Sequence, residues 1–365
     1  MSGQTSGAAS VLRDIIRKPY FWGIIAIVAL LLLNVLKDPS YLAVSVSPST
    51  GYLVGNLIDI MRYSAPILMI AIGMSLVIAT GGIDLSVGSI MAVSGAVSMQ
   101  LLSNVDASTS VSAALAAVGL AILISALLGA VNGALVAYIG LQPFISTLIM
   151  MLAGRGIAKV ITSGQNTAAS NEPFRWIANG FIFGLPVIFL IAIIIVIIVS
   201  VVVRKSALGL MIEAIGINPK ASRMAGIKPR GLLMTVYIAS ASLAGVAGIF
   251  SVGTVMTVDI SRTGYQMELD AILAVVIGGA SLAGGKFSLG GAVVGALLIA
   301  TLDKTVLFLG ISSSATPAFK AIVIVALCLL QSRRVRAWFV TRRKPPLSPP
   351  PPKQKTPATA QEVSA

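Results

Sequence analysis

The stretch Arg204–Gly231, RKSALGLMIEAIGINPKASRMAGIKPRG, is a polar and basic segment between two long apolar runs. The runs, 181–203 and 232–254, are each long enough to cross a lipid bilayer. The segment therefore predicts a loop outside the bilayer that connects two membrane-spanning helices.

Capping signals predict two short helices inside this loop. Ser206 is placed to cap a helix over 207–215, which Gly216 would end before a tight turn. The signals of the second helix are Asn218 at the N-cap, Pro219 at the first helical position and Gly226 past the end.

Apolar and charged side chains lie side by side on both predicted helices. The apolar ones are Leu208, Met211, Ile212 and Met224, and the charged ones are Glu213, Lys220, Arg223 and Lys228. Apolar side chains rimmed by charge suit docking into a groove on another protein. The alternative is an ordinary basic loop that its charge holds on the inner side of the membrane.

The composition identifies an integral membrane protein. Of the 365 residues, 56% are hydrophobic and 10% are charged, whereas a soluble domain has about 25% charged residues. The formal net charge is +14. Because the basic residues lie in loops and tails, we assign them to topology and to contacts with anionic membrane lipid, and we expect no binding to nucleic acid.

The chain lacks the residues that most enzymatic or metal sites need. It has no histidine and a single cysteine, Cys328, so we predict no catalytic, cofactor-binding or metal-ligating residues. The run Gly284-Gly285-Lys286 is not a phosphate loop, because Ala280 and Phe287 stand where that motif requires Gly and Ser or Thr. ATP hydrolysis is therefore expected in a separate subunit.

Apolar runs recur along the chain and predict an all-α membrane domain with about ten spans. The predicted spans are 20–36, 64–80, 85–102, 112–139, 143–163, 181–203, 232–254, 269–284, 289–309 and 316–331. The membrane domain thus covers 20–331, after a short N-terminal segment, 1–19. The tail, 332–365, is basic and Pro-rich and is predicted to be disordered and solvated, with a Pro-rich recognition motif as the alternative.

The distribution of Lys and Arg predicts the orientation. An even number of spans puts both termini on one side, together with the 204–231 loop. That side holds 18 Lys and Arg residues, against 8 on the other side and in the spans nearest it. The excess predicts that the termini and this loop are cytoplasmic.

Two apolar stretches, 71–90 and 268–286, are interrupted by Gly-Gly pairs, which hints at an internal duplication. In the first, Asp84 follows Gly81-Gly82. A carboxylate is costly in hydrocarbon, so one interpretation is an unwound element beside a translocation cavity. The other is a tight turn in which Asp84 caps the next helix.

Four blocks of sequence resemble the permease family of bacterial ABC importers for ribose, galactose, xylose and related sugars, with branched-chain amino acid permeases as more distant kin. The blocks are Gly73–Gly88 (GMSLVIATGGIDLSVG), Gln142–Gly156 (QPFISTLIMMLAGRG), Glu213–Gly226 (EAIGINPKASRMAG) and Glu268–Gly285 (ELDAILAVVIGGASLAGG). Within this family, the amino-acid sequence of these blocks is most similar to that of galactofuranose-type permeases.

The resemblance implies a type II ABC importer permease fold with about ten helices, in the bacterial cytoplasmic (inner) membrane. It implies three kinds of partner: an ABC ATP-binding subunit, an extracytoplasmic sugar-binding protein, and a second permease copy or a related permease. It also implies that the segment Glu213–Gly226 supplies the helices that couple the permease to the ATPase. The coupling residues would be Glu213, Gly216, Asn218, Pro219, Lys220, Arg223 and Gly226.

A path for sugars needs polar partners for hydroxyl groups. Candidates along the translocation path are Asp84, Ser86, Asn132, Gln142 and Thr147, and for each a purely structural role is the alternative. The resulting expectation is a monosaccharide permease for a pentose or hexose, with galactofuranose as one candidate, that works by alternating access. A branched-chain amino acid permease is the runner-up, followed by a stand-alone secondary carrier and a membrane-embedded enzyme or scaffold.

Overall fold

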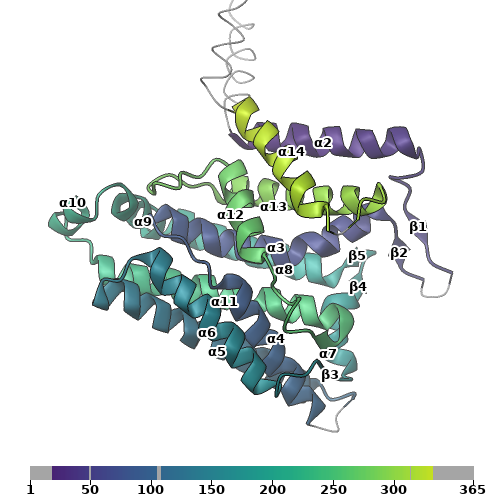
Figure 1. Ribbon diagram of the computed structural model, residues 1–365, viewed down its shortest axis with the longest axis horizontal. Coiled ribbons are helices and arrows are strands. Elements are labelled where there is room, and N and C mark those ends of the chain that lie inside the picture. Colours follow the sequence, from purple (N-terminus) through teal and green to yellow (C-terminus); the bar gives the residue numbers. More distant parts are fainter. Residues whose placement is uncertain (1–18, 49–50, 105–107, 313, 332–365) are drawn as a thin grey trace, which may run out of the picture.

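The computed structural model describes residues 19–48, 51–104, 108–312 and 314–331, and its architecture is a bundle of packed helices (Figure 1). The predicted tail and most of the N-terminal segment lie outside the described residues. The helices are α2 (Pro19–Lys37), α3 (Asn56–Ala79), α4 (Val87–Ser103), α5 (Val111–Ala134) with a π-helical end η1 (Leu135–Ile139), α6 (Pro143–Ile161), α7 (Glu172–Asn179), α8 (Val187–Lys205), α9 (Leu208–Ile217), α10 (Pro219–Met224), α11 (Pro229–Val255), α12 (Met267–Ile277), α13 (Leu289–Phe308) and α14 (Thr316–Gln331).

Three antiparallel pairs of two-residue strands complete the described part of the chain. They are β1 (Ser45–Val46) with β2 (Leu53–Val54), β3 (Thr167–Ala168) with β6 (Thr257–Val258), and β4 (Phe181–Ile182) with β5 (Leu185–Pro186). Figure 1 shows these pairs and α7 at one end of the helical body, and α9 and α10 at the other. We call the two ends the hairpin end and the α9–α10 end.

Each of the ten predicted spans falls on a helix, which confirms an all-α membrane protein. Within the described residues, seven helices are long and apolar enough to cross a bilayer: α2, α3, α5 with η1, α6, α8, α11 and α13. The helices α4 and α14 are shorter apolar helices. The predicted count of ten is therefore approximate.

Three predicted spans have different bounds in the structure. Helix α3 begins eight residues before the predicted 64, at Asn56, and the predicted span at 181 opens with the β4–β5 hairpin instead of a helix. The predicted span 269–284 is the largest miss, because α12 has 11 residues and ends at Ile277. Gly278 and the left-handed Gly279 (φ 94°) end it.

Helix α12 reaches only partway through the bundle. Eleven residues rise about 16 Å, roughly half the hydrocarbon thickness. The chain before α12 is irregular, and Gly264 (φ 68°) lies backbone to backbone against Gly88 at the start of α4. Irregular backbone at this depth is tolerated where protein covers it.

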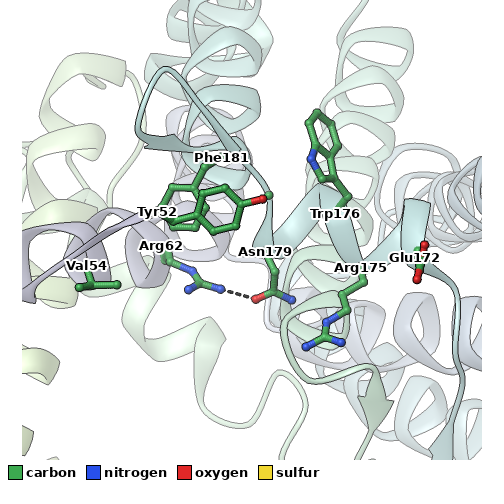
Figure 2. Close-up of a pocket in the computed structure, with 9 residues that line it drawn as sticks. Tyr52, Val54, Arg62, Glu172, Arg175, Trp176, Asn179 and Phe181 are labelled. Atoms are coloured by element: carbon green, nitrogen blue, oxygen red, sulfur yellow. Dashed lines mark hydrogen bonds between the residues drawn. The ribbon is translucent and has the colours of Figure 1, made fainter. Parts of the chain in front are cut away.

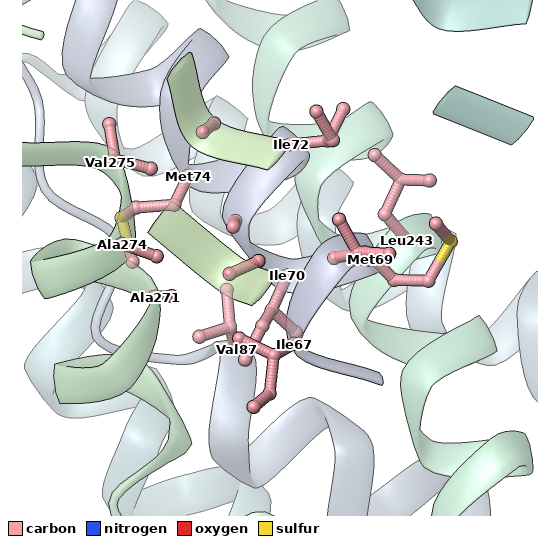
Figure 3. Close-up of a cluster of buried hydrophobic side chains, with 14 of the residues drawn as sticks. Ile67, Met69, Ile70, Ile72, Met74, Val87, Leu243, Ala271, Ala274 and Val275 are labelled. Carbon is pink, nitrogen blue, oxygen red and sulfur yellow. The ribbon is translucent and has the colours of Figure 1, made fainter. Parts of the chain in front are cut away.

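Helix α3 is the centre of the bundle and is buried along most of its length. A helix that is apolar all round must be covered by other helices, and α3 packs against α8, α11, α12 and α13. Figure 3 shows α3 side chains such as Met69 and Met74 gathered with Leu243 of α11 and Ala274 of α12. Close packing uses small residues, as at Gly73, which lies against Ser240 of α11.

Candidate functional site: an exposed helix pair and three polar sites

Helices α9 and α10 form the predicted helix pair of the 204–231 loop. Asn218 has an extended backbone, and its side-chain oxygen accepts hydrogen bonds from the backbone N–H groups of Lys220 and Ala221, both at 3.0 Å. Pro219 takes the first position of α10, and Gly226 follows the helix at φ 86°. The second short helix is therefore confirmed, with its predicted start and end signals.

The prediction that Gly216 ends the first helix is wrong, because α9 continues to Ile217. The residue that ends it is Asn218, which precedes a proline and is therefore disfavoured in helical conformation. Gly216 lies in the helix where a Cβ atom would collide with the carbonyl oxygen of Ala79 and the backbone of Gly285. Its lack of a side chain permits this contact.

The predicted start of the first helix also differs. Helix α9 begins at Leu208, and Ser206 ends α8, where its hydroxyl donates to the Val202 carbonyl at 2.5 Å. The same hydroxyl accepts from the N–H of Leu208 at 3.3 Å. Ser206 thus connects the two helices at the bend.

The outward face of α9 and α10 is apolar with basic neighbours. The exposed apolar side chains are Leu210, Ile217 and Met224, the last two 76% and 89% exposed. The predicted apolar face is correct only for Met224. Ile212 is buried, and Leu208 and Met211 pack partly against the core. Which side of α9 faces inward depends on α3, and the local sequence does not contain that information.

The charged side chains of the pair lie around this face. Lys220 and Arg223 are exposed on α10. Glu213 is half-buried and lines a shallow cavity of about 270 Å³ with Arg204 and Ser288. The exposed apolar patch and its charged rim therefore have the character of a protein-docking surface.

Glycines connect this surface to the bundle. The N–H of Gly285 donates to the Ala79 carbonyl at the end of α3, at 2.9 Å. A Cβ on Gly284 would lie 2.9 Å from the carbonyl oxygen of Gly216 and 2.9 Å from the Cα of Gly81. The end of α9, the end of α3 and the α12–α13 connection thus meet backbone to backbone, so a movement of α9 would displace both neighbours.

The structure joins three of the predicted path residues in one buried network, the Asp84 network. One carboxylate oxygen of Asp84 accepts from the N–H and hydroxyl of Ser86 at 3.0 and 2.5 Å. The other accepts from the hydroxyl of Ser240 in α11 at 3.0 Å. The amide of Asn132 in α5 donates to Ser86 Oγ at 2.9 Å, and Asp84 is 1% exposed.

The two remaining path residues lie at the start of α6. Thr147 is buried, and its hydroxyl donates to the carbonyl of Ile83 at 3.0 Å, beside the Asp84 network. Gln142 is exposed at the N-cap of α6 and makes no capping hydrogen bond with its side chain. The structure therefore packs four of the five path residues into the bundle and leaves Gln142 at the surface.

A second polar group, the Lys320 cluster, was not predicted. Lys320 of α14 contacts both carboxylate oxygens of Asp270 in α12, at 3.1 and 3.0 Å, and Asp303 of α13 at 2.8 Å. Lys320 contributed to the predictions only as one of the eight Lys and Arg residues on the less basic side. Its position inside a predicted span was the available signal, since an ionisable residue within a membrane usually has a partner or a function.

The hairpin end carries a third polar site, a pocket of about 420 Å³ (Figure 2). Arg62 of α3 donates to the side-chain oxygen of Asn179 in α7. The amide of Asn179 donates to the carbonyl of Gly253 in α11 at 3.0 Å, which ties three helices together. Tyr52 and Phe181 stack beside the pocket, with ring centroids 4.7 Å apart.

Nothing in the described residues suggests a bound metal. No three His, Cys, Asp or Glu side chains in that part of the chain gather as metal ligands would.

Comparisons with known proteins give the family. Residues 56–331 match the family model described as the permease component of branched-chain amino acid transport systems. The chain is 55% identical to a fructose import permease of Bifidobacterium longum, over 86% of this chain and 88% of that protein. It is 40% identical to a galactofuranose transporter permease of Escherichia coli, over 85% and 89% of the two chains. No solved structure matches. The chain therefore belongs to the family of transport-system permease components whose model it matches.

Proposed function

We propose that this protein is the transmembrane permease subunit of an ATP-driven ABC importer for a monosaccharide. The observation that carries the proposal is the exposed apolar patch of α9 and α10, mounted by backbone contacts on the central helix, in a chain whose relatives are named as sugar import permeases. A ribose import permease of Escherichia coli is a third such relative, 38% identical over 78% of this chain and 87% of its own. The three sugars in these names, fructose, galactofuranose and ribose, are all pentoses or hexoses, so we propose a sugar of this size as the substrate.

In this proposal the α9–α10 patch docks on an ABC ATP-binding subunit. Ile217 and Met224 enter its groove, and Lys220 and Arg223 contact the rim. Asn218, Pro219 and Gly226 shape the pair, Gly216 seats it on α3, and Glu213 lines the cavity at its base. The permease itself transfers no chemical group to or from the sugar. It provides two conformations and a path between them.

Alternating access follows from the backbone junction. When ATP closes the ATPase pair, α9 moves, and its contacts with Ala79 and Gly285 carry α3 and the α12–α13 connection with it. Packed helices transmit such shifts because close-packed interfaces resist compression. The path residues Asp84, Ser86, Asn132, Gln142 and Thr147 remain a prediction within this mechanism.

The hairpin end would receive the extracytoplasmic sugar-binding protein. The pocket there combines basic and aromatic side chains, including Arg62, Arg175 and Trp176, and such residues are enriched where proteins dock. A second permease, identical or related, completes the pore in this proposal. The membrane is the bacterial cytoplasmic membrane, with the termini and the 204–231 loop cytoplasmic, as the Lys and Arg distribution predicts.

The decisive experiment is affinity purification of the chain in mild detergent, with the accompanying subunits identified by mass spectrometry. We expect an ATPase subunit with the wild type, and a loss of about tenfold or more in its recovery with Ile217→Asp or Met224→Asp, because a charge in a buried contact costs more than about 1.4 kcal/mol. Phe183→Asp is the matched control, since Phe183 is fully exposed at the hairpin end.

If all three variants recover the ATPase subunit as well as the wild type does, α9 and α10 do not dock on it. Uptake that survives ATP depletion would favour a stand-alone carrier instead. A branched-chain amino acid is the second candidate substrate, because the matching family model carries that description. Uptake of leucine in preference to fructose and ribose, measured with the assembled importer, would establish it.

A further inference from the structure

A cleft of about 560 Å³ lies between α12 and α14. Its lining is mostly apolar and includes Leu273 of α12 and Ile324 of α14. Four polar side chains of the same two segments also line it: Gln266, Asp270, Thr316 and Lys320. Its volume lies within the range of about 300–1,000 Å³ typical of small-molecule sites.

Two members of the Lys320 cluster, Lys320 and Asp270, line this cleft. Two carboxylates face one ammonium group, so the cluster carries net negative charge. The side chain of Asp270 is 14% exposed and that of Lys320 16%. A carboxylate can accept about four hydrogen bonds, so Asp270 keeps acceptor capacity on the side that faces the cleft.

Charged groups among apolar helices are stabilised by partners of opposite charge and by water. Asp270 lies one turn into α12, a helix whose start packs against Gly88 inside the bundle. Hydrocarbon against the open side of the cluster would be costly. Water in the cleft would supply the partners that the acceptor capacity of Asp270 still lacks.

The backbone at the mouth of the cleft is unusual. Gln266 precedes α12 in a left-handed conformation (φ 59°), while its carbonyl accepts from the N–H groups of Leu269 and Asp270. Residues other than glycine are held in this region at a cost, and such positions cluster at functional sites. The strain here places an amide side chain and the exposed ring of Tyr265 next to the cleft.

We propose that the α12–α14 cleft holds a neutral monosaccharide during its passage through the permease. Asp270, Gln266 and Thr316 would hydrogen-bond its hydroxyl groups, and Tyr265 with the apolar lining residues would cover its C–H face. Lys320 is a positioning residue that holds Asp270. The negative cluster disfavours phosphorylated sugars. This inference rests on the proposed sugar import.

The test is cysteine accessibility in proteoliposomes that contain the chain with its accompanying subunits. In a Cys328→Ala background, Gln266→Cys and Thr316→Cys are exposed to a positively charged methanethiosulfonate reagent. Leu123→Cys, on the exposed apolar face of α5, is the matched control. Millimolar fructose, ribose, fructose 6-phosphate and leucine are the competing probes.

We expect both cleft cysteines to react and the control to stay unreactive. Fructose or ribose should slow the reaction of Gln266→Cys about tenfold when it fills about nine-tenths of the sites, because only the unoccupied fraction reacts. Fructose 6-phosphate and leucine should not protect. Thr316→Cys gives a second readout should Gln266→Cys assemble poorly.

Three outcomes would overturn the proposal. Cleft cysteines as unreactive as Leu123→Cys would mean that lipid or protein covers the cleft. Reaction without protection by either sugar would mean that no sugar binds there. Protection by leucine alone would assign the cleft to an amino acid. ATP-driven sugar uptake by the Cys328→Ala background, measured first, tests the proposed function separately from the cleft.

Discussion

The Asp84 network and the Lys320 cluster are both polar groups set among apolar helices, and they differ in what surrounds them. Asp84 is 1% exposed, and its oxygens accept from two serines of the bundle. Asp270 lies on an open cleft, and one lysine serves two carboxylates. Both oxygens of Asp84 have donors within the bundle, although the side-chain oxygen of Asn132 has none among the described residues. Asp270 keeps unused hydrogen-bonding capacity beside the cleft.

This difference indicates different roles. A buried carboxylate whose two oxygens are hydrogen-bonded within the bundle rigidifies its surroundings. A charged group beside a cleft can exchange partners with a passing solute without breaking the packing of the bundle. The comparison therefore assigns stability mainly to the Asp84 network and solute contact mainly to the Lys320 cluster.

The largest effect is expected for Asp84→Ala. It removes three hydrogen bonds, from the N–H and hydroxyl of Ser86 and the hydroxyl of Ser240. At about 1 kcal/mol or more for each bond, the free energy of unfolding should fall by about 3 kcal/mol. The loss is measured as a lower midpoint of thermal unfolding in detergent, with the folded fraction at each temperature determined by size-exclusion chromatography.

Asp38→Ala is the matched control for Asp84→Ala. Asp38 accepts from the N–H and hydroxyl of Ser40, at 2.9 and 2.7 Å, in the same Asp-x-Ser arrangement but at a partly exposed position after the end of α2. These hydrogen bonds lower the pKa of Asp38. We expect no measurable change in unfolding for this variant. An equal loss in the two variants would contradict the structural role of burial at Asp84.

A smaller effect is expected for Lys320→Met. It leaves the carboxylates of Asp270 and Asp303 without their common cation. Because the cluster borders an open cleft, the loss of stability should be about 2 kcal/mol, below that of a fully buried pair. Adding Asp303→Asn to Lys320→Met removes one of the two unpaired carboxylates and should restore part of the lost stability. A double-mutant cycle over Lys320 and Asp303 measures the coupling free energy between the two residues. Absence of coupling would mean that water screens the cluster completely.

The features predicted correctly have local causes. Long apolar runs decide that α3, α8 and α11 are membrane helices, whatever packs against them. Asn218 sets the start of α10 because its side chain caps the first backbone N–H groups, and Pro219 does so because its fixed φ angle suits the first helical position. The short length of α12 also has a local cause, Gly278-Gly279. The predicted span was too long because the apolar pattern continues beyond these glycines.

The features that were missed depend on residues far apart in the chain. Lys320 meets Asp270 across 50 positions, and Ser240 meets Asp84 across 156. Gly216 resembled a helix end because glycine usually has that role, but it lies within α9, where Ala79 of a distant helix leaves no room for a side chain. Such pairings follow from the packing of the bundle, which no local pattern encodes.

The smallest effect on stability is expected for Gln142→Ala. Gln142 alone among the predicted path residues is exposed, and its side chain does not cap α6, so the free energy of unfolding should change by less than about 0.5 kcal/mol. If its amide contacts the sugar, losing one hydrogen bond of about 0.5–1 kcal/mol slows ATP-driven uptake about two- to fivefold at an unchanged protein level. Unchanged uptake would remove Gln142 from the path and leave the α12–α14 cleft as the place where a sugar meets side chains. Slower uptake would instead extend the path to the start of α6, beside the Asp84 network, because Thr147 of the same helix donates to the Ile83 carbonyl next to Asp84.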